Sequence, residues 1–522
     1  MTAHEALTHD DACYLALKAR DARFDGCFFT GVTSTGIYCR PVCRVRSPKR
    51  ENCRFFTHAA QAERAGFRPC LRCRPELAPR MPVLSLAPEA RTWSIQDASS
   101  ILAGQAARLL DSPQDWDNAA PSMQQLAQRL GVSDRHLRRI FEAQFGVSPL
   151  QYLQTRRLLS AKQLLTDTTL AVTQVAAMSG FASVRRFNAA FAEHYALNPT
   201  QLRRAGASCE QGAMDQSIHV RLAYRPPYDV DAMLRFFGTR QITGIEDVTQ
   251  EPDQQRIRKT VAVHDGNQLY AGWLVARFDT QRSQVDLHLS DSLRDVLPQV
   301  MARVRAMLDL DADPLAINKL LHTRFPLGDG LRVPGALDGF ELAVRAVLGQ
   351  QISVAAARTL ATRLVERFGE PVATPITALN RLFPRPATLA GASADALGLL
   401  GIVKQRQAAI QAIASAVIND RLQLHAQANV AATVTALKAL PGIGDWTAQY
   451  IAMRALRWPD AFPSGDVALH KALGLQNAKN PTKEAQAASQ AWRPWRSYAV
   501  IRAWASMAAA AGSRKANSVA IK

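Results

Sequence analysis

The chain has 522 residues, 48% hydrophobic and 20% charged, and this length suits three or four domains better than a single core. Lys and Arg outnumber Asp and Glu by 63 to 44, so the net charge is +19, which favours a polyanionic partner such as nucleic acid. An apolar run of about 18 residues, a lipidation signal and a secretory leader are all absent from the sequence, which argues against a membrane protein and predicts a cytoplasmic one.

Proline, glycine and polar punctuation divides the chain into four predicted domains. Residues 1–80 are rich in Cys and Arg and end at "RPELAPRMP", and residues 81–207 have apolar residues at helical spacing. After the linker "GASCEQGAMDQS", residues 216–310 contain "IHVRLAYRPPYDV" and "VAVHDGNQLYAGWLVARF", whose period-two alternation predicts strands. Residues 311–510 return to a helical, Ala- and Leu-rich sequence. We therefore expect a multidomain, mainly α fold, with a small α+β domain, a helical domain, an α+β sheet domain and an all-α domain in that order.

The first predicted domain contains seven of the eight cysteines. In a chain without a leader, such clustering favours metal or thiol chemistry over disulfides. Cys39 and Cys43 stand four apart, and Cys70 and Cys73 form a C-x-x-C. Two such pairs, brought together, supply the four thiolates of a tetrahedral zinc site. Spacing alone leaves open whether that zinc serves chemistry or only folds the domain.

These cysteines lie in recognisable segments. "FDGCFFTGVTSTGIYCRPVC", "ENCRFF" and "AGFRPCLRC" closely resemble the N-terminal domain of the Ada family over about residues 10–77. The resemblance implies that Cys39 is both a zinc ligand and the acceptor of a methyl group from a DNA phosphotriester. It implies three further ligands, Cys43, Cys70 and Cys73. Transfer would remove one negative charge from the site, which makes it a one-way electrostatic switch.

Basic and polar residues around the cysteines are candidate DNA contacts. The resemblance implies Thr35 and Arg46 as contacts to the DNA backbone. Arg40, Arg44 and Arg72 also flank the ligands, and we expect them to meet neighbouring phosphates. A solvated charged surface without a ligand is the alternative for each.

The second predicted domain contains an internal repeat. "MQQLAQRLGVSDRHLRRIFEAQFGVSPLQYL" and "VTQVAAMSGFASVRRFNAAFAEHYALNPTQL" align, and each predicts a helix, a turn at Gly131 or Gly180, and a second helix. In a helix-turn-helix the second helix enters the major groove. Its predicted DNA-contacting residues are Arg135, His136, Arg138 and Arg139 in the first copy and Arg185 and Arg186 in the second. The predicted core residues are Leu137, Ile140, Phe187 and Phe191. An ordinary basic helical bundle is the alternative.

The repeat resembles the AraC-type transcription-factor domain, and its position after the cysteine-rich domain is the Ada arrangement. The resemblance implies a methylation-activated regulator that binds promoter DNA as a monomer and contacts RNA polymerase. The sequence contains no Pro-Cys-His-Arg motif, so alkyl acceptance from guanine oxygen is not expected.

The last stretch contains "ALPGIGDWTAQYIAMRAL", in which Gly442 and Gly444 form a Gly-x-Gly turn that leaves backbone N–H groups open to a DNA phosphate. "AFPSGDVAL" follows and places Asp466 at a helix start. With "YRPPYDVDAMLRFF", "LRVPGALDGFELAVRAVLGQQISVAAA" and "WRPWRSYAVIRAW", these segments resemble the helix-hairpin-helix glycosylases, in particular the AlkA class of 3-methyladenine DNA glycosylases, over about residues 218–508.

This second resemblance implies that Asp466 is the catalytic carboxylate, which either stabilises a cationic sugar or orients water. A plain helix cap is the alternative. Trp446 stands where strand-cutting relatives carry a lysine, so we expect no Schiff base and a monofunctional enzyme. The implied base pocket consists of Trp446, Tyr450 and Trp504, and the implied DNA contacts include Gln350, Gln351, Gly442 and Gly444. Two departures affect the lesion range: Gln351 replaces an apolar wedge, and Val467 replaces an aromatic residue.

The sequence thus predicts a zinc-containing alkylation sensor and regulator fused to a base-excision enzyme, with alkylated and promoter double-stranded DNA as partners. Two alternatives stay open. One is a transcriptional regulator whose glycosylase-like half is inactive, and the other is a glycosylase whose zinc site is inert.

Overall fold

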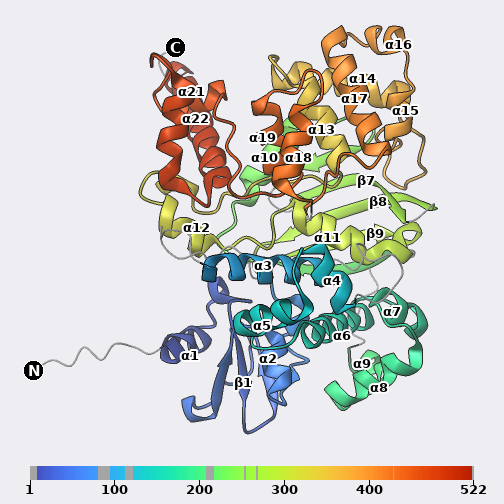
Figure 1. The fold of residues 1–522 in the computed structure, drawn as a ribbon, viewed down its shortest axis with the longest axis vertical. Coiled ribbons are helices and arrows are strands. Elements are labelled where there is room, and N and C mark those ends of the chain that lie inside the picture. Colours follow the sequence, from blue (N-terminus) through green and yellow to red (C-terminus); the bar gives the residue numbers. More distant parts are fainter. Residues whose placement is uncertain are drawn as a thin grey trace, which may run out of the picture. The chain divides into compact units, whose positions relative to one another are not determined.

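The computed structural model describes residues 9–79, 95–111, 122–206, 217–251, 254–265, 268–426 and 428–519. Residues 80–82 of the first predicted linker and 207–216 of the second, with Cys209, lie outside this part of the chain. The fold is multidomain and mainly α, as predicted (Figure 1). It divides into unit 1, with residues 1–226, 279–285 and 311–313, and unit 2, with residues 227–278, 286–310 and 314–522. None of the described helices has the length and hydropathy needed to cross a bilayer.

Unit 1 begins with a small four-stranded sheet in the order β3-β1-β2-β4. The strands are β1 (Phe29–Val32), β2 (Ile37–Cys39), β3 (Cys53–Phe56) and β4 (Arg68–Pro69), and the helices are α1 (His9–Ala19) and α2 (Ala59–Arg64). β1 and β2 form an antiparallel hairpin, whereas β2 and β4 are parallel. The hairpin turn needs Gly36, whose φ is 64°. Phe29, Tyr38, Ala62 and Phe67 form the core between sheet and α2.

The remaining helices of unit 1 form the helical domain that contains the sequence repeat, which begins at Met123. They are α3 (Ile95–Leu110), α4 (Met123–Arg129), α5 (Asp134–Phe145), α6 (Pro149–Asp167), α7 (Val172–Met178), α8 (Val184–Tyr195) and α9 (Pro199–Gly206). The turns between α4 and α5 and between α7 and α8 contain Gly131 and Gly180, with φ of 67° and 81°. α5 and α8 begin at the serine caps Ser133 and Ser183. The predicted core residues are at most 6% exposed, which confirms that they face the core: Leu137, Ile140, Phe187 and Phe191.

The predicted strands after the second linker are present, but the first is shorter than the alternation suggests, and the second predicted segment is divided between two strands. β5 covers Ser217–Ala223 only, because two prolines follow, and α10 (Val230–Arg240) begins within the predicted strand "IHVRLAYRPPYDV". In unit 2 the strands β9 (Gln284–Ser290), β8 (Gln268–Asp279), β7 (Arg256–Asp265) and β6 (Glu246–Thr249) are neighbours in that order. β7 and β8 pair antiparallel from Arg256↔Arg277 to Asp265↔Gln268.

The helices of unit 2 form two groups, which Figure 1 shows in yellow to orange and in red. The first group surrounds a core built on α13 and α17. Its members are α13 (Gly339–Leu348), α14 (Val354–Phe368), α15 (Pro386–Ala390), α16 (Ala394–Gly398), α17 (Lys404–Ile418), α18 (Val430–Lys438) and α19 (Asp445–Arg454). The second group is α20 (Val467–Ala472), α21 (Pro481–Ala488) and α22 (Arg496–Val519). The other α-helices described in unit 2 are α10, α11 (Leu297–Met307) and α12 (Pro314–Leu321).

A buried cluster of four charges joins the sheet of unit 2 to α13. Lys259 Nζ lies 2.6 Å from Glu246 and 2.8 Å from Glu341, and Arg345 contacts the same two carboxylates at 2.6 and 2.8 Å. Two cations and two anions therefore compensate one another where water is excluded.

Candidate functional site

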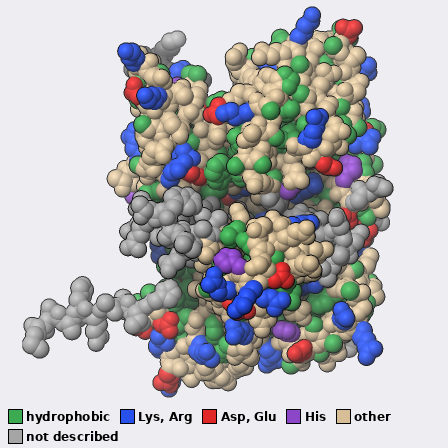
Figure 2. Space-filling view, in the orientation of Figure 1, with side chains coloured by type: hydrophobic (Ala, Val, Ile, Leu, Met, Phe, Trp, Pro, Cys, Tyr) green, Lys and Arg blue, Asp and Glu red, His purple; other side chains and the backbone are tan. Residues whose placement is uncertain are grey.

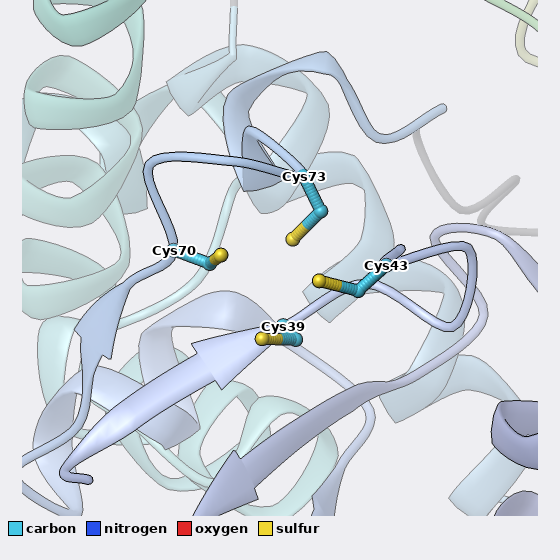
Figure 3. A group of neighbouring side chains, drawn as sticks. All are labelled: Cys39, Cys43, Cys70 and Cys73. Carbon is cyan, nitrogen blue, oxygen red and sulfur yellow. The ribbon is translucent and has the colours of Figure 1, made fainter. Parts of the chain in front are cut away.

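The four predicted zinc ligands converge in unit 1. β2 and β4 pair in parallel register, with Tyr38 opposite Pro69, so Cys39 and Cys70 occupy the next position on neighbouring strands. The Cys70 N–H donates to the Tyr38 carbonyl at 2.9 Å and fixes this alignment. Cys43 and Cys73 approach from the loops that follow the two strands, and the four Sγ atoms lie within 4.8 Å of one another (Figure 3).

Arg40 holds the two ligand loops together from inside the domain. Its side chain is buried and forms an ion pair with the Asp25 carboxylate, and its Nη1 donates to the Cys73 carbonyl at 2.9 Å. The Arg40 backbone N–H also donates to Cys73 Sγ at 3.3 Å. The expectation that Arg40 meets a DNA phosphate is therefore wrong, because its guanidinium is occupied by internal partners. Sequence reasoning missed this role, since Asp25 lies 15 residues before Arg40 and the spacing does not show that the two side chains meet.

The cysteine set fits zinc. Four sulfurs at about 2.3 Å from a tetrahedral metal lie about 3.8 Å apart, and the observed separations accommodate that arrangement. Hydrogen bonds with Cys43 and Cys70 raise the pKa of Cys39, whereas hydrogen bonds from Cys39, Cys43 and Cys73 lower the pKa of Cys70. A divalent cation bound by the four sulfurs would hold them as thiolates.

The other predicted contacts near the cysteines lie on the surface. Thr35, Arg44, Arg46 and Arg72 are all exposed, and Thr35 donates through its hydroxyl to the Val32 carbonyl at 3.3 Å. These four side chains remain candidates for phosphate contact, in contrast to Arg40.

The predicted DNA-contacting residues of α5 lie on one helix face. Arg135, Arg138 and Arg139 are exposed, and Asp134 and Glu142 complete the lining of the same surface hollow. Figure 2 shows Lys and Arg side chains gathered over this helix. His136 is half-buried, and its Nδ1 lies 3.2 Å from Arg139 Nη2. Arg185 and Arg186 are exposed on α8.

A buried ionic contact, not predicted from the sequence, links the cysteine loop to α6. Arg74 follows Cys73 directly, and its guanidinium contacts Glu76 at 2.9 Å and Asp167 at 2.5 Å. Lys162 of α6 also pairs with Glu76. The Glu76 and Asp167 side chains are each 1% exposed. Loss of Arg74 would therefore remove a compensating cation from two buried carboxylates, which is unfavourable.

In unit 2, three N–H donors hold the Asp466 carboxylate. Oδ1 accepts from the Leu469 N–H at 2.7 Å and from Trp504 Nε1 at 3.0 Å, while Oδ2 accepts from Trp446 Nε1 at 2.9 Å. Asp466 is the N-cap of α20, so the capping role and a catalytic role share one side chain. Each carboxylate oxygen has two lone pairs, and the Trp446 bond uses only one of those on Oδ2.

The three predicted pocket rings lie together beside this carboxylate. The Trp446 and Tyr450 rings stack with centroids 5.2 Å apart at 13°, and Trp504 lies 6.3 Å from Tyr450. Arg454 Nη1 donates to the Tyr450 hydroxyl at 2.6 Å. Burial alone raises the pKa of Tyr450, but the guanidiniums of Arg454 and Arg240 outweigh burial and set it below its ordinary value. The sequence did not predict contacts of these two arginines with Tyr450. Arg240 in particular lies far from the segment "ALPGIGDWTAQYIAMRAL" that contains Tyr450.

The hairpin turn before α19 is open to solvent. Gly442 has a φ of 75°, and a Cβ at Gly444 would meet no atom within 4 Å. Gln350 Nε2 donates to the Gly442 carbonyl at 2.9 Å and to Thr447 Oγ1 at 3.0 Å, so it supports the turn from behind. Gln351 is exposed and has a φ of 56°, a left-handed backbone conformation that residues other than glycine rarely adopt. Val467, beside Asp466, is 66% exposed.

Four family models match successive stretches of the chain. The family model "Metal binding domain of Ada" matches residues 12–76, and "Helix-turn-helix domain" matches 126–205. "AlkA N-terminal domain" matches residues 219–338, and "HhH-GPD superfamily base excision DNA repair protein" matches 344–497. The class is therefore that of proteins which combine an Ada-type metal-binding and regulatory half with a helix-hairpin-helix base-excision half.

Three relatives show how these halves are distributed among proteins. The probable bifunctional transcriptional activator/DNA repair enzyme AlkA of Mycobacterium tuberculosis is 36% identical over 509 residues, which cover 96% of this chain and 97% of the relative. The DNA-3-methyladenine glycosylase 2 of Escherichia coli is 32% identical over 284 residues, 54% of this chain and 95% of the relative. The regulatory protein ada of Salmonella typhimurium is 39% identical over 153 residues, 29% and 38% of the two chains.

The chain belongs to the Ada–AlkA family of bifunctional transcriptional activators and DNA repair enzymes. Its cofactor is zinc, as the cysteine pattern predicts. The family assignment thus confirms the resemblances to Ada, AraC-type and AlkA-class proteins that the sequence motifs carry.

Proposed function

We propose that the protein senses and repairs DNA alkylation with two centres: unit 1 accepts a methyl group from a DNA phosphotriester on Cys39, and unit 2 releases alkylated bases. The observation that supports this most is the Asp466 carboxylate, fixed by three N–H donors beside a wall of aromatic rings. A DNA-binding relic would have no need of a carboxylate held in this way next to a base-sized aromatic surface.

In the proposed methyl transfer, Cys39 Sγ attacks the methyl carbon of a phosphate triester. A carbon–sulfur bond forms and the carbon–oxygen bond breaks, and its electron pair stays on the phosphate oxygen. Zinc, when bound, keeps its ligand sulfurs deprotonated at neutral pH. The triester becomes an ordinary anionic diester, and the cysteine cluster loses one negative charge.

That loss of charge supports a role in transcription. The exposed residues Arg44, Arg46 and Arg72 surround the cluster, and α5 and α8 present arginines in the same unit. Reducing the negative charge of the cluster lowers its repulsion from DNA phosphates, so the methylated form binds promoter DNA more tightly. We extend the proposal to RNA polymerase as the partner that a DNA-bound monomer contacts, and to four functional domains with the boundaries given under Sequence analysis.

In the proposed base excision, Asp466 acts on the sugar of an extruded nucleotide. The N-glycosidic bond breaks, its electron pair leaves with the base, and water adds to the sugar. The remaining acceptor direction on Oδ2 suits either contact with the cationic sugar or a hydrogen bond from the attacking water. The position after the hairpin carries Trp446 in place of a lysine, so the strand stays intact and the enzyme is monofunctional.

The rings favour alkylated purines as substrates. A base alkylated on a ring nitrogen is cationic, and an aromatic face attracts it by about 0.5–2 kcal/mol per contact over a neutral base. It is also a better leaving group, so a carboxylate and a stacking surface suffice without an added general acid. We therefore propose 3-methyladenine as the representative substrate.

Methyl acceptance is tested by mass spectrometry of the full, zinc-loaded chain mixed with duplex DNA that carries methylphosphotriesters. One methyl group on the peptide containing Cys39 is expected. Cys53→Ala, which removes a buried cysteine outside the cluster, should leave the transfer intact, whereas Cys39→Ala should abolish it. An unmethylated Cys39 after prolonged incubation would leave zinc with a structural role only.

Base excision is tested by chromatographic assay of 3-methyladenine released from methylated duplex DNA. Asp466→Asn should abolish release and leave promoter binding unchanged. Asp445→Asn is the matched control, because Asp445 stands next to Trp446 at the start of α19 but is exposed and pairs with Lys438 at 3.0 Å. Release by Asp466→Asn at the normal rate removes Asp466 from the mechanism, and no release by the unmodified protein favours a regulator with an inactive glycosylase-like half.

A further inference from the structure

Three loops of unit 2 are fastened to one another around the hairpin turn. Gln350, in the loop after α13, bonds the Gly442 carbonyl at 2.9 Å, and Arg406, in the first turn of α17, bonds the Gln350 carbonyl. A Cβ added at Gly442 would lie 3.4 Å from the Gln405 carbonyl oxygen. The turn, the loop that carries Gln351 and the segment before α17 therefore form one continuous surface.

The segment before α17 displays apolar side chains to solvent. Leu399 is 89% exposed and Val403 is 55% exposed, and Val354, at the start of α14, is 44% exposed. The neighbouring Leu400 is half-buried against the core. Single exposed apolar side chains are common on protein surfaces. Here Val403 directly precedes the first turn of α17, whose Gln405 and Arg406 lie against Gly442 and Gln350, and Leu399 lies four residues before Val403.

The loop that carries Leu399 is held in shape. Gln407 Nε2 donates to the Ile402 carbonyl at 2.6 Å, and Arg363 Nη1 donates to the Leu400 carbonyl at 3.2 Å. Gly401 completes the turn with a φ of 86°, which another residue would adopt only with strain. A preorganised apolar side chain loses little conformational entropy when a partner covers it.

The neighbouring loop lacks such a group. Gln351 is exposed and has a left-handed backbone conformation, but its side chain is a polar amide. Extruding a nucleotide leaves a gap in the base stack, and apolar side chains fill such gaps at lower cost than a solvated amide, which must lose water.

We propose that Leu399, supported by Val403, packs into the minor groove of the duplex beside an extruded nucleotide and supplies the apolar contact that Gln351 does not. The occupant is double-stranded DNA, because the hairpin turn is open to a phosphate and the exposed Lys404 adjoins the apolar pair on a chain of net charge +19. The inference rests on the proposed base excision and identifies a further residue that stabilises the extruded state.

The test compares two exposed leucines in the full, zinc-loaded chain. Leu399→Ser removes the proposed contact. Leu327→Ser is the matched control, since Leu327 is 92% exposed in a short 3₁₀ turn (Pro326–Gly328) that packs on α22. The probe is a duplex with a stable abasic-site analogue opposite 2-aminopurine, measured against an excess of unmodified competitor duplex so that binding by the helix-turn-helix helices cancels.

Leu399→Ser should weaken the preference for the analogue duplex by about tenfold or more and diminish the 2-aminopurine fluorescence change, because a covered leucine is replaced by a hydroxyl. Leu327→Ser should behave as the unmodified protein, and Gln351→Leu should restore part of the loss in the Leu399→Ser background. Equal behaviour of the two serine variants overturns the inference. Release of 3-methyladenine by the unmodified protein is measured in parallel, and its absence would instead overturn the proposed excision.

Discussion

Replacing Trp446 by phenylalanine removes one hydrogen bond from the Asp466 carboxylate, the proposed catalytic group, and keeps an aromatic ring beside it. Trp446 Nε1 lies 2.9 Å from Asp466 Oδ2 and is the donor that the structure gives this oxygen among the described residues. Oδ1, in contrast, has two donors, from the Leu469 backbone and Trp504. Without the indole N–H, the carboxylate can rotate about its Cβ–Cγ bond and leave the position that faces the sugar.

The magnitude follows from that bond. A hydrogen bond to a charged group contributes about 1.5–3 kcal/mol, which corresponds to about 10- to 150-fold in rate if the contact is fully expressed in the transition state. We expect the single-turnover rate of 3-methyladenine release to fall by that range, while affinity for an abasic-site analogue changes little. Trp504→Phe should lose less, because Oδ1 keeps the Leu469 N–H at 2.7 Å.

Trp492→Phe provides the comparison for general damage. Trp492 is buried and packs against Phe325 and Phe462 without a hydrogen bond to Asp466. A Trp446→Phe enzyme that keeps its full rate, or that slows only as much as Trp492→Phe, would show that the indole N–H does not position the carboxylate. A drop in binding without a drop in rate would assign Trp446 to stacking alone.

Arg40→Met should destabilise the cysteine-rich domain by about 3–5 kcal/mol in chemical denaturation, because the Asp25 carboxylate stays buried without its cation. Adding Asp25→Leu to Arg40→Met should recover part of this loss. Unchanged stability of Arg40→Met would contradict the role of the ion pair. Burial lowers the pKa of His58 to about 4, below the ordinary 6.5, so the folded state prefers the neutral ring and loses stability as pH falls through this window. Relative to His58→Gln, the native protein should lose about 2 kcal/mol between pH 7 and pH 5, and an unchanged difference would refute the burial effect. Removing zinc with a chelator should lower the calorimetric transition of unit 1 and leave that of unit 2 in place, whereas an equal shift of both would contradict a local metal site.

Local patterns predicted the parts of this protein that depend on short spacing. The C-x₃-C and C-x₂-C pairs predicted the cysteine cluster, because each pair sits where a strand ends and the register of β2 with β4 brings the pairs together. The two helix-turn-helix copies were equally clear, since a glycine with positive φ and a serine cap recur at matching places. Asp466 combined a helix-start position with a family motif, and the structure places it beside the predicted rings.

Contacts between distant residues could not be predicted in the same way. Arg40 looked like a phosphate ligand because it stands between two cysteines, but the buried Asp25, 15 residues earlier, neutralises it. The Arg74–Asp167 contact spans 93 residues, and neither residue belongs to a periodic pattern. Arg454 stands only four residues from Tyr450, but the second guanidinium that lowers the Tyr450 pKa is Arg240, which comes from the distant helix α10. A single sequence states which charges exist but not which of them meet inside the fold.

The attachment of Arg74 to α6 has a consequence for how a promoter is chosen. Arg74, the residue after Cys73, is bonded to α6, the helix between the two helix-turn-helix copies. Under the proposed function, the Cys39 acceptor and the recognition helices α5 and α8 would therefore reach the duplex at a fixed separation. When both sites are bound, the stretch of DNA backbone that faces Cys39 would lie a set number of base pairs from the sequence contacted by α5 and α8. Inserting five base pairs between these footprints would turn one of them to the opposite side of the helix, and inserting ten would return it to the same side.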